Sequence, residues 1–275
     1  MGTDSCEGEH SSPPDGVDVH EWSRRLKAEW QQRACSSRSN FYIASHVGWQ
    51  DETARQRQAE LDCALVLTGL PDAFLSTADV FEVGCGYGRL VPCLAPRVQS
   101  YTGMDIAPTF VAQARAARFP TARFFETDGS SVPEAAKDRT YDLIFSAAVL
   151  IHCPLAVIHA LVPECLKLLS PTGRMRIQLL ADPHDLSGII TAESLEDMAE
   201  RVTRETAATN NDQSATVEAE LATDTHCYMG HAFTYAEAAG FAKACAGSVF
   251  THFLLRMDPL FIYVEFTVDG HGQQR

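Results

Sequence analysis

The sequence has few basic residues and no long apolar run, and each shortage excludes a class of protein. Lys and Arg number 22 against 36 Asp and Glu, which gives a formal net charge of −14. No run of Lys or Arg interrupts this acidic balance, and such a surface repels phosphate backbones, so we expect no nucleic-acid partner. No apolar stretch reaches the roughly 18 residues that a bilayer-spanning helix needs, so we expect no membrane partner.

The sequence also lacks the marks of secretion and of metal binding. Its first residues contain neither the basic nor the apolar part of a secretory signal. Its nine cysteines are scattered singly, without a Cys-x-x-Cys pair, which is typical of reduced thiols in the cytoplasm. A cluster from His226 to His231 has metal-binding residue types but no third ligand group. We therefore expect a cytoplasmic location and no metal site.

Composition and pattern divide the chain into five segments. Residues 1–19 are polar and rich in Pro, Gly and Ser, which predicts a disordered tail. Residues 20–75 predict a helical N-terminal cap, and residues 76–182 a ligand-binding core. Residues 183–230 interrupt the core pattern and are long enough to form a helical lid over a substrate. Residues 231–275 predict a helix and a final pair of strands.

The N-terminal cap carries two helical patterns. Apolar residues recur every four positions on one face of the first helix, over residues 20–35: Trp22, Leu26 and Trp30. Asp51 is placed to cap the second helix. The inner face of that second helix is predicted to consist of Leu61, Ala64 and Leu65.

Strand and helix patterns alternate through the core. Short apolar segments predict parallel strands over residues 80–83, 101–105, 123–127, 141–145 and 175–180. Helical patterns over residues 108–119 and 154–169 separate some of them. Such alternation predicts an α/β fold in which helices cover both faces of a parallel sheet.

The last segment closes this sheet in a specific way. Thr234 and Glu237 form a capping-box pattern at the start of a helix. Residues 249–255 and 260–266 then predict strands joined by a short turn, and so short a link requires them to run antiparallel. The sequence therefore predicts a doubly wound, mostly parallel seven-stranded sheet with an antiparallel C-terminal hairpin.

The first core strand leads into a helical pattern through a glycine-rich segment, Glu82-Val83-Gly84-Cys85-Gly86-Tyr87-Gly88. Glycines there let the backbone turn tightly and approach a ligand, and a helix N-terminus adds free N–H groups. Asp105 ends the next strand about 20 residues later, the spacing of an acid that binds ribose hydroxyls. Dinucleotide-binding loops run G-x-G-x-x-G, whereas this segment runs G-x-G-x-G, which disfavours a nicotinamide cofactor.

These residues resemble the class I, Rossmann-like S-adenosylmethionine-dependent methyltransferases of the small-molecule type. The first motif of that family is an acid, any residue and then G-x-G-x-G, matched by Glu82 to Gly88. Its later motifs are an acid closing the second strand, an acid after the third strand, and the fourth strand with its continuation. They match Asp105-Ile106, Asp128-Gly129 and the segment from Asp142 to His152. The resemblance covers about residues 78–182.

The resemblance implies that the chain binds S-adenosyl-L-methionine and releases S-adenosyl-L-homocysteine. Gly84 and Gly86 would lie against the methionine part of the cofactor, and Asp105 would accept two hydrogen bonds from the ribose diol. Ile106 would cover the adenine ring, and Asp128 would accept from its amino group. The remaining expected cofactor-binding residues are Glu82, Cys85, Gly129 and Ala147, with Cys85 packing rather than reacting.

His152 is the candidate catalytic residue. It follows the fourth strand at the edge where ligands of open α/β folds bind, so it could act as a general base or contact the substrate. The alternative is that it only packs or hydrogen-bonds near the cofactor. His184, after the fifth strand, could also face the pocket, and Tyr42 is expected either to close over the cofactor or to pack in the core.

The sequence thus predicts an enzyme that moves a methyl group to an oxygen, nitrogen or carbon atom of a small-molecule acceptor, with a secondary metabolite favoured. The alternatives are a non-catalytic protein that binds S-adenosylmethionine, a protein methyltransferase and a nicotinamide-dependent oxidoreductase. No motif identifies the acceptor, the methylated atom or the oligomeric state.

Overall fold

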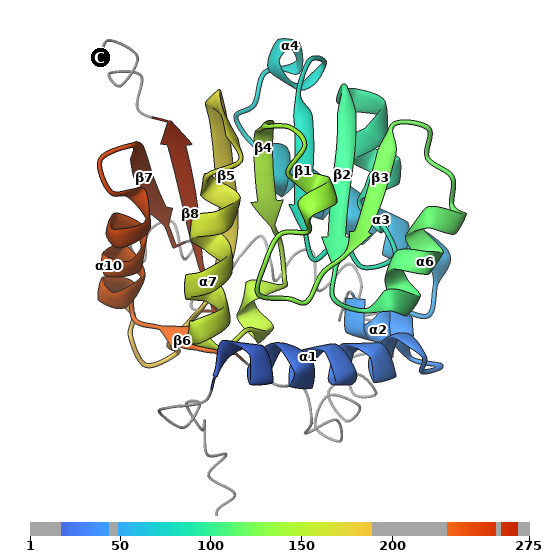
Figure 1. Ribbon diagram of the computed structural model, residues 1–275, viewed down its shortest axis with the longest axis horizontal. Helices are drawn as coiled ribbons and strands as arrows, with labels where there is room; N and C mark the ends of the chain where they lie inside the picture. The colour runs from blue at the N-terminus through green and yellow to red at the C-terminus, as the bar shows by residue number, and fades with distance from the viewer. Residues whose placement is uncertain (1–17, 44–48, 189–229, 257–259, 269–275) are drawn as a thin grey trace, which may run out of the picture.

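The computed structural model describes residues 18–43, 49–188, 230–256 and 260–268, and in these residues one sheet lies between two layers of helices (Figure 1). The strand order is β3-β2-β1-β4-β5-β8-β7, with the short β6 paired to β5. The strands are β1 Asp79–Val83, β2 Ser100–Asp105, β3 Ala122–Glu126, β4 Tyr141–Ser146, β5 Leu169–Ala181, β6 Ala232–Phe233, β7 Phe250–Leu255 and β8 Phe261–Val268.

The predicted sheet is confirmed in its topology. The pairs among β1 to β5 are parallel, as is the pair of β5 with β6, whereas β8 runs antiparallel to both β5 and β7. The continuous path contains the seven strands that the sequence predicts, and the two-residue β6, which pairs with β5, is an addition that periodicity did not indicate. The proposed turn between β7 and β8 includes residues outside the described ranges.

Helices cover both faces of the sheet. They are α1 Val19–Ala34, α2 Ser39–Ile43, α3 Glu52–Leu67, α4 Asp72–Leu75, α5 Val91–Leu94, α6 Pro108–Ala116, α7 Leu155–Leu166 and α10 Tyr235–Ala246. Single 3-10 turns occur at Ala95–Arg97, Glu134–Ala136 and Leu150–His152. Among these helices, none has both the length and the apolar character that a membrane span requires.

Two apolar clusters hold the layers together, one on each face of the sheet. Ile158 of α7 and Phe241 of α10 belong to the cluster that includes Phe81 of β1. Val111 of α6 belongs to the cluster on the opposite face, which includes Leu143 of β4. Because the central strands are buried on both sides, they appear in the sequence as continuous apolar runs rather than as alternating patterns.

Side chains at two helix starts satisfy free backbone N–H groups as predicted. The Asp51 carboxylate accepts a hydrogen bond from the Ala54 N–H at 2.8 Å, at the start of α3. At the start of α10, Thr234 and Glu237 form the reciprocal bonds of a capping box. These contacts explain why both helices begin where the sequence places them.

The predicted inner face of α3 is wrong. Leu61 and Leu65 are 60% and 41% exposed, and Ala64 is exposed as well. The buried residues of the helix are Ala59, Cys63, Val66 and Leu67. Apolar residues lie on two sides of this helix, so a second stripe with helical spacing competes with the first, and only packing against the sheet selects between them.

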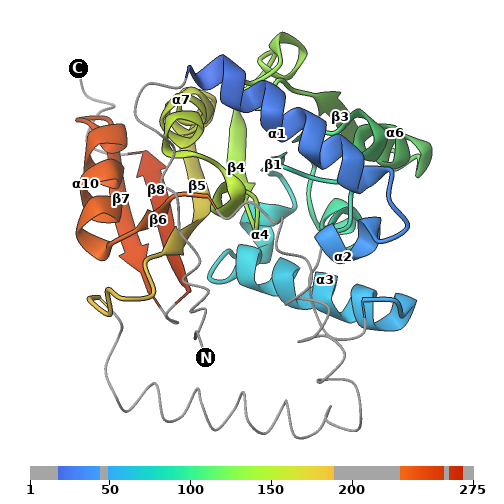
Figure 2. The same ribbon diagram turned by 90° about the horizontal axis from the view of Figure 1, so that it is seen from below.

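Helix α1 lies across the end of the sheet where the parallel strands finish, as Figures 1 and 2 show from two directions. It contacts α6 on one side of the sheet and α7 on the other. Lys27 of α1 pairs with Glu126, the last residue of β3. The helix is thereby held over the loops that follow β1 to β4.

Two of the five predicted segments lie largely outside the described residues. The proposed tail, residues 1–19, is described only from residue 18 onward. The proposed lid, residues 183–230, is described only at residues 183–188 and 230. Most of the cluster between His226 and His231 is also outside these ranges.

Candidate functional site

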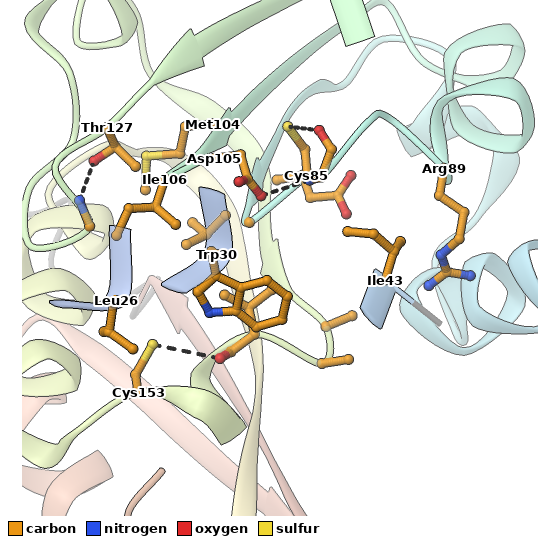
Figure 3. Close-up of a pocket in the computed structure, with 18 of the residues that line it drawn as sticks. Leu26, Trp30, Ile43, Cys85, Arg89, Met104, Asp105, Ile106, Thr127 and Cys153 are labelled. Carbon is orange, nitrogen blue, oxygen red and sulfur yellow. Dashed lines mark hydrogen bonds between the residues drawn. The ribbon is translucent and has the colours of Figure 1, made fainter. Parts of the chain in front are cut away.

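A cavity opens where the direction of strand order reverses. From β1 the chain builds β2 and β3 on one side of the sheet, and it then returns to build β4 and β5 on the other side. The loops after β1 and β4 therefore diverge and leave a crevice, the usual ligand site of open α/β sheets. The cavity has a volume of about 870 Å³ including its solvent-open part (Figure 3).

All but one of the predicted cofactor-binding residues line this cavity. They are Glu82, Gly84, Cys85, Gly86, Asp105, Ile106, Gly129 and Ala147. These residues come from four different loops and strand ends, which the parallel sheet brings to one edge. The exception, Asp128, lies between two residues that do line the cavity, Thr127 and Gly129.

The glycine loop needs its glycines for conformation and for space. Gly84 and Gly86 have φ angles of 80° and 55°, in the left-handed region that disfavours side chains. A Cβ atom at Gly84 would overlap the side chain of Val149, and one at Gly86 would lie 2.7 Å from Cδ1 of Ile43. The loop is therefore in close contact with the segment after β4 and with the cap.

Asp105 presents a buried carboxylate to the cavity. Its Oδ2 accepts a hydrogen bond from the Gly86 N–H and its Oδ1 from the Ala107 N–H, both at 2.8 Å. Only 8% of the residue is exposed, and this burial raises the pKa of the carboxyl to about 6, although hydrogen bonds from the backbone N–H groups of Ala107, Gly86 and Ile106 lower it. Each carboxylate oxygen can accept more than one hydrogen bond, which suits recognition of two adjacent hydroxyl groups.

Glu82 is a second buried acid at the same edge. It is 4% exposed and accepts a hydrogen bond from the hydroxyl of Tyr101. Burial raises its pKa to about 7, although Tyr101 and the charge of Arg89 oppose that shift. Arg89, which also lines the cavity, pairs with Asp62 of α3 at 2.6 Å.

Asp128 shapes the loop after β3. Its Oδ1 accepts hydrogen bonds from the backbone N–H groups of Ser130 and Ser131 at 2.8 and 2.9 Å. Burial would raise the pKa of this carboxyl, but the hydrogen bonds from the two serines outweigh burial and lower it. The predicted adenine contact of Asp128 stays a prediction, because its neighbours rather than Asp128 itself line the cavity.

His152 lies beside the cavity rather than in its wall. Its ring packs edge-on against Trp30, with the ring centroids 5.3 Å apart, and it is not among the described residues that line the cavity. His184 is exposed after β5 and is likewise outside the described lining. The role of His152 as a base stays a prediction.

The N-terminal cap supplies lining residues that the sequence did not identify as part of the site. Leu26, Trp30 and Ile43 face the cavity (Figure 3). Tyr42, for which a place over the cofactor was one alternative, also lines it. The Arg33 guanidinium lies 4.7 Å from the centroid of the Trp30 ring and 5.3 Å from that of Tyr42. In the sequence Trp30 had the spacing of a helix-packing residue, and only the crossing of α1 over the sheet brings it to the site.

Within the described residues, no three His, Cys, Asp or Glu side chains gather as metal ligands would. The charged groups of the cavity are instead Glu82, Asp105 and Arg89. The arrangement therefore offers carboxylates, backbone N–H groups and apolar walls to a ligand.

In comparison with known proteins, the core is similar to methyltransferases. Residues 80–173 match the family described as "Methyltransferase domain". Over 104 residues the chain is 36% identical to the biotin biosynthesis bifunctional protein BioCD of Bordetella avium, covering 37% of this chain and 20% of that protein. Over 102 residues it is 34% identical to a trans-aconitate 2-methyltransferase of Escherichia coli, covering 36% of this chain and 38% of the enzyme. The matched part thus spans well under half of the length of these relatives.

Solved structures extend the likeness to most of the fold. A complex of DhpI with S-adenosylhomocysteine superimposes with a TM-score of 0.56 at 16% identity, covering 92% of this chain and 100% of that one. The 1,6-didemethyltoxoflavin-N1-methyltransferase of Burkholderia thailandensis gives a TM-score of 0.53 at 18% identity, covering 92% and 91%. At such identities the likeness concerns the fold.

Proposed function

We propose that the chain transfers the methyl group of S-adenosylmethionine to a small-molecule acceptor, because residues 80–173 match a methyltransferase domain. The observation that carries this proposal is the pair of hydrogen-bonding oxygens of Asp105, a buried residue that lines the cavity and binds the G-x-G-x-G loop through the Gly86 N–H. A nucleoside with two free ribose hydroxyls is the ligand that this carboxylate fits best.

The cavity residues fit the three parts of the cofactor. Asp105 would bind the ribose diol through charge-assisted hydrogen bonds, which are stronger than neutral ones. Ile106 and Met104 would pack against the adenine ring. Arg89 would pair with the carboxylate of the methionine part, because it supplies a cation to the lining and has more donors than its bond to Asp62 uses.

The remaining lining residues would place the acceptor and exclude water. The cofactor supplies an activated methyl group, so the main task of the protein is to hold the acceptor atom in line with it, which can lower a barrier by roughly 7–11 kcal/mol. Leu26, Trp30 and Val149 form apolar walls suited to that purpose. His152 remains the proposed base for an acceptor that carries a proton, and it would contribute about 10²–10⁴-fold.

A small acceptor is supported by two observations. The net charge of −14 opposes binding of nucleic acid, and the cap residues Trp30 and Tyr42 close one side of the cavity. Similar proteins are named for small-molecule acceptors, namely trans-aconitate and didemethyltoxoflavin.

The test is calorimetric titration of the full-length protein with S-adenosylhomocysteine and, separately, with NAD. We expect heat of binding only with the former. Mass spectrometry of small-molecule libraries incubated with protein and S-adenosylmethionine then identifies products that have gained a methyl group. Binding without turnover of any acceptor would favour a non-catalytic role, and binding of NAD alone would refute the assignment of the cofactor.

A further inference from the structure

Ala148, in the segment that follows β4, has a strained backbone. Its φ angle is 58°, in the left-handed region, and among the described residues only Arg118 is another non-glycine residue with a positive φ. For an alanine this conformation is unfavourable, because the Cβ atom crowds the following carbonyl oxygen. Ala148 lines the cavity together with its neighbours Ala147 and Val149, so the strain lies in the wall of the site.

A side chain from the neighbouring strand holds this turn. The Ala148 N–H donates to Oε1 of Gln178, on β5, at 2.7 Å. Gln178 lies opposite Tyr263 of β8 in the sheet, and its Nε2 donates to the Tyr263 hydroxyl at 3.3 Å. The carboxamide oxygen of Gln178 therefore binds the turn, and its nitrogen binds the neighbouring strand of the sheet.

The turn controls the space around the glycine loop. Val149 follows Ala148 directly, and its side chain occupies the place that a Cβ atom at Gly84 would need. The Val149 carbonyl also accepts a hydrogen bond from the His152 N–H at 2.9 Å. A change in the backbone at Ala148 would thus move the apolar wall against the glycine loop and shift the start of the 3-10 turn that carries His152.

We propose that Gln178 is a positioning residue of the active site, which fixes the left-handed turn at Ala148 and through it the wall of the cofactor cavity. Gln178 is not itself among the described residues that line the cavity, so it acts through the turn. The proposal rests on the proposed function, because the position of the cavity wall is tested through the affinity for the product S-adenosylhomocysteine.

Calorimetric titration with S-adenosylhomocysteine tests the proposal on the full-length protein. Gln178→Met keeps the length of the side chain but removes the acceptor, and we expect affinity to fall roughly five- to tenfold. Gln178→Glu restores an acceptor for the Ala148 N–H, and its carboxylate can also accept from the Tyr263 hydroxyl. We therefore expect this variant to bind within about twofold of wild type. Gln113→Met, on the exposed face of α6, is the control for a glutamine remote from the cavity.

Rescue by glycine separates positioning from ordinary packing. Glycine adopts the left-handed conformation without strain, so Ala148→Gly should reduce the effect of Gln178→Met to about twofold or less. An equal loss of affinity in both backgrounds, or wild-type affinity of Gln178→Met, would overturn the proposal. Should Gln178→Met fail to fold, Gln178→Asn replaces it, because its shorter amide stays polar but cannot reach the turn.

Two readouts distinguish failure of this proposal from failure of the proposed function. If the wild type does not bind S-adenosylhomocysteine, the proposed function is wrong, whereas binding that is unaffected by residue 178 refutes only the positioning role. Thermal unfolding without ligand of the wild type, Gln178→Met, Ala148→Gly and the variant with both substitutions, a double-mutant cycle, supplies the second readout. Coupling between positions 148 and 178 in that cycle supports the contact independently of any cofactor, and its absence contradicts it.

Discussion

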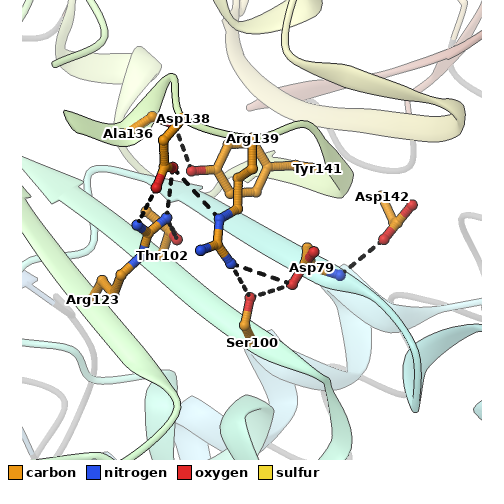
Figure 4. Close-up of polar contacts among 9 residues, drawn as sticks. All are labelled: Asp79, Ser100, Thr102, Arg123, Ala136, Asp138, Arg139, Tyr141 and Asp142. Carbon is orange, nitrogen blue, oxygen red and sulfur yellow. Dashed lines mark hydrogen bonds and ion pairs between the residues drawn. The ribbon is translucent and has the colours of Figure 1, made fainter. Parts of the chain in front are cut away.

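At the carboxyl ends of the parallel strands, Glu82 and Asp105 are 4% and 8% exposed, and burial raises the pKa of each carboxyl. At the amino ends of the same strands, carboxylates are partly solvated and paired with arginines and hydroxyls (Figure 4). There a bidentate contact with Arg123 lowers the pKa of Asp138.

The difference shows which end of the sheet is suited to binding a ligand. An acid that is desolvated and partly satisfied by backbone N–H groups makes the unliganded fold less stable but is preorganised to bind donors on a ligand. An acid that pairs with protein side chains has little left to offer a ligand and contributes only to the fold. Substitutions at the two ends should therefore separate binding from stability.

The largest expected effect is on binding at the carboxyl end. Asp105→Ala removes two charge-assisted hydrogen bonds to the ribose diol, so affinity for S-adenosylhomocysteine should fall at least about 100-fold. The stability of the unliganded protein should change by less than about 1 kcal/mol, because loss of an unfavourably buried charge offsets loss of the bonds to Gly86 and Ala107. Calorimetry and urea unfolding measure the two quantities. Unchanged affinity would contradict the assignment of the ribose site.

The contrast between the ends also explains how much of the site the sequence could predict. The acids and glycines at positions 82 to 88 and 105 lie in short contiguous motifs, and their strand ends bring them together wherever the sheet forms. The contributions of Trp30, Leu26 and Ile43 depend on how α1 and α2 lie against the sheet, which local pattern does not encode. Thr127 was missed as a lining residue for another reason. Its hydroxyl donates to the Ser131 carbonyl and accepts from the Gly129 N–H, and these contacts form only in the folded loop.

The second prediction concerns the amino ends of the strands, where a substitution should lower stability and leave affinity unchanged. Asp142 accepts hydrogen bonds from the Asp79 N–H at 2.9 Å and from the Ser170 hydroxyl at 2.6 Å, joining β1, β4 and β5. Asp142→Ala leaves both donors unpaired, and we expect a loss of about 1–3 kcal/mol in the free energy of unfolding. Affinity for S-adenosylhomocysteine should stay within about twofold, since the site lies at the opposite end of the sheet. A large loss of affinity in the folded variant would show that the two ends are not independent.

The third prediction concerns pH. Because Glu82 has a pKa of about 7 in the folded chain and an ordinary value of 4.5, the folded state keeps a proton in this window that the unfolded state has lost. Stability must therefore fall as pH rises through the folded pKa, by about 1 kcal/mol between roughly pH 6 and 8. Glu82→Gln can still accept from Tyr101 and should flatten this part of the profile. Urea midpoints across the range provide the measurement, and a slope that survives the substitution would assign it to another group.

The smallest expected effect belongs to the ion pair between Arg123 and Asp138. It is bidentate, with distances of 2.8 and 3.1 Å, but the side chains are 33% and 47% exposed, so solvent and salt screen it. Asp138→Asn removes the ion pair but leaves the Arg123 guanidinium over the Phe125 ring, 5.5 Å from its centroid, and should lower the free energy of unfolding by about 0.2–1 kcal/mol. The loss should shrink at high salt, and affinity for S-adenosylhomocysteine should not change. A salt-independent loss of several kcal/mol would mean that this end of the sheet holds its charges as tightly as the cavity does, and the contrast between the two ends would fail.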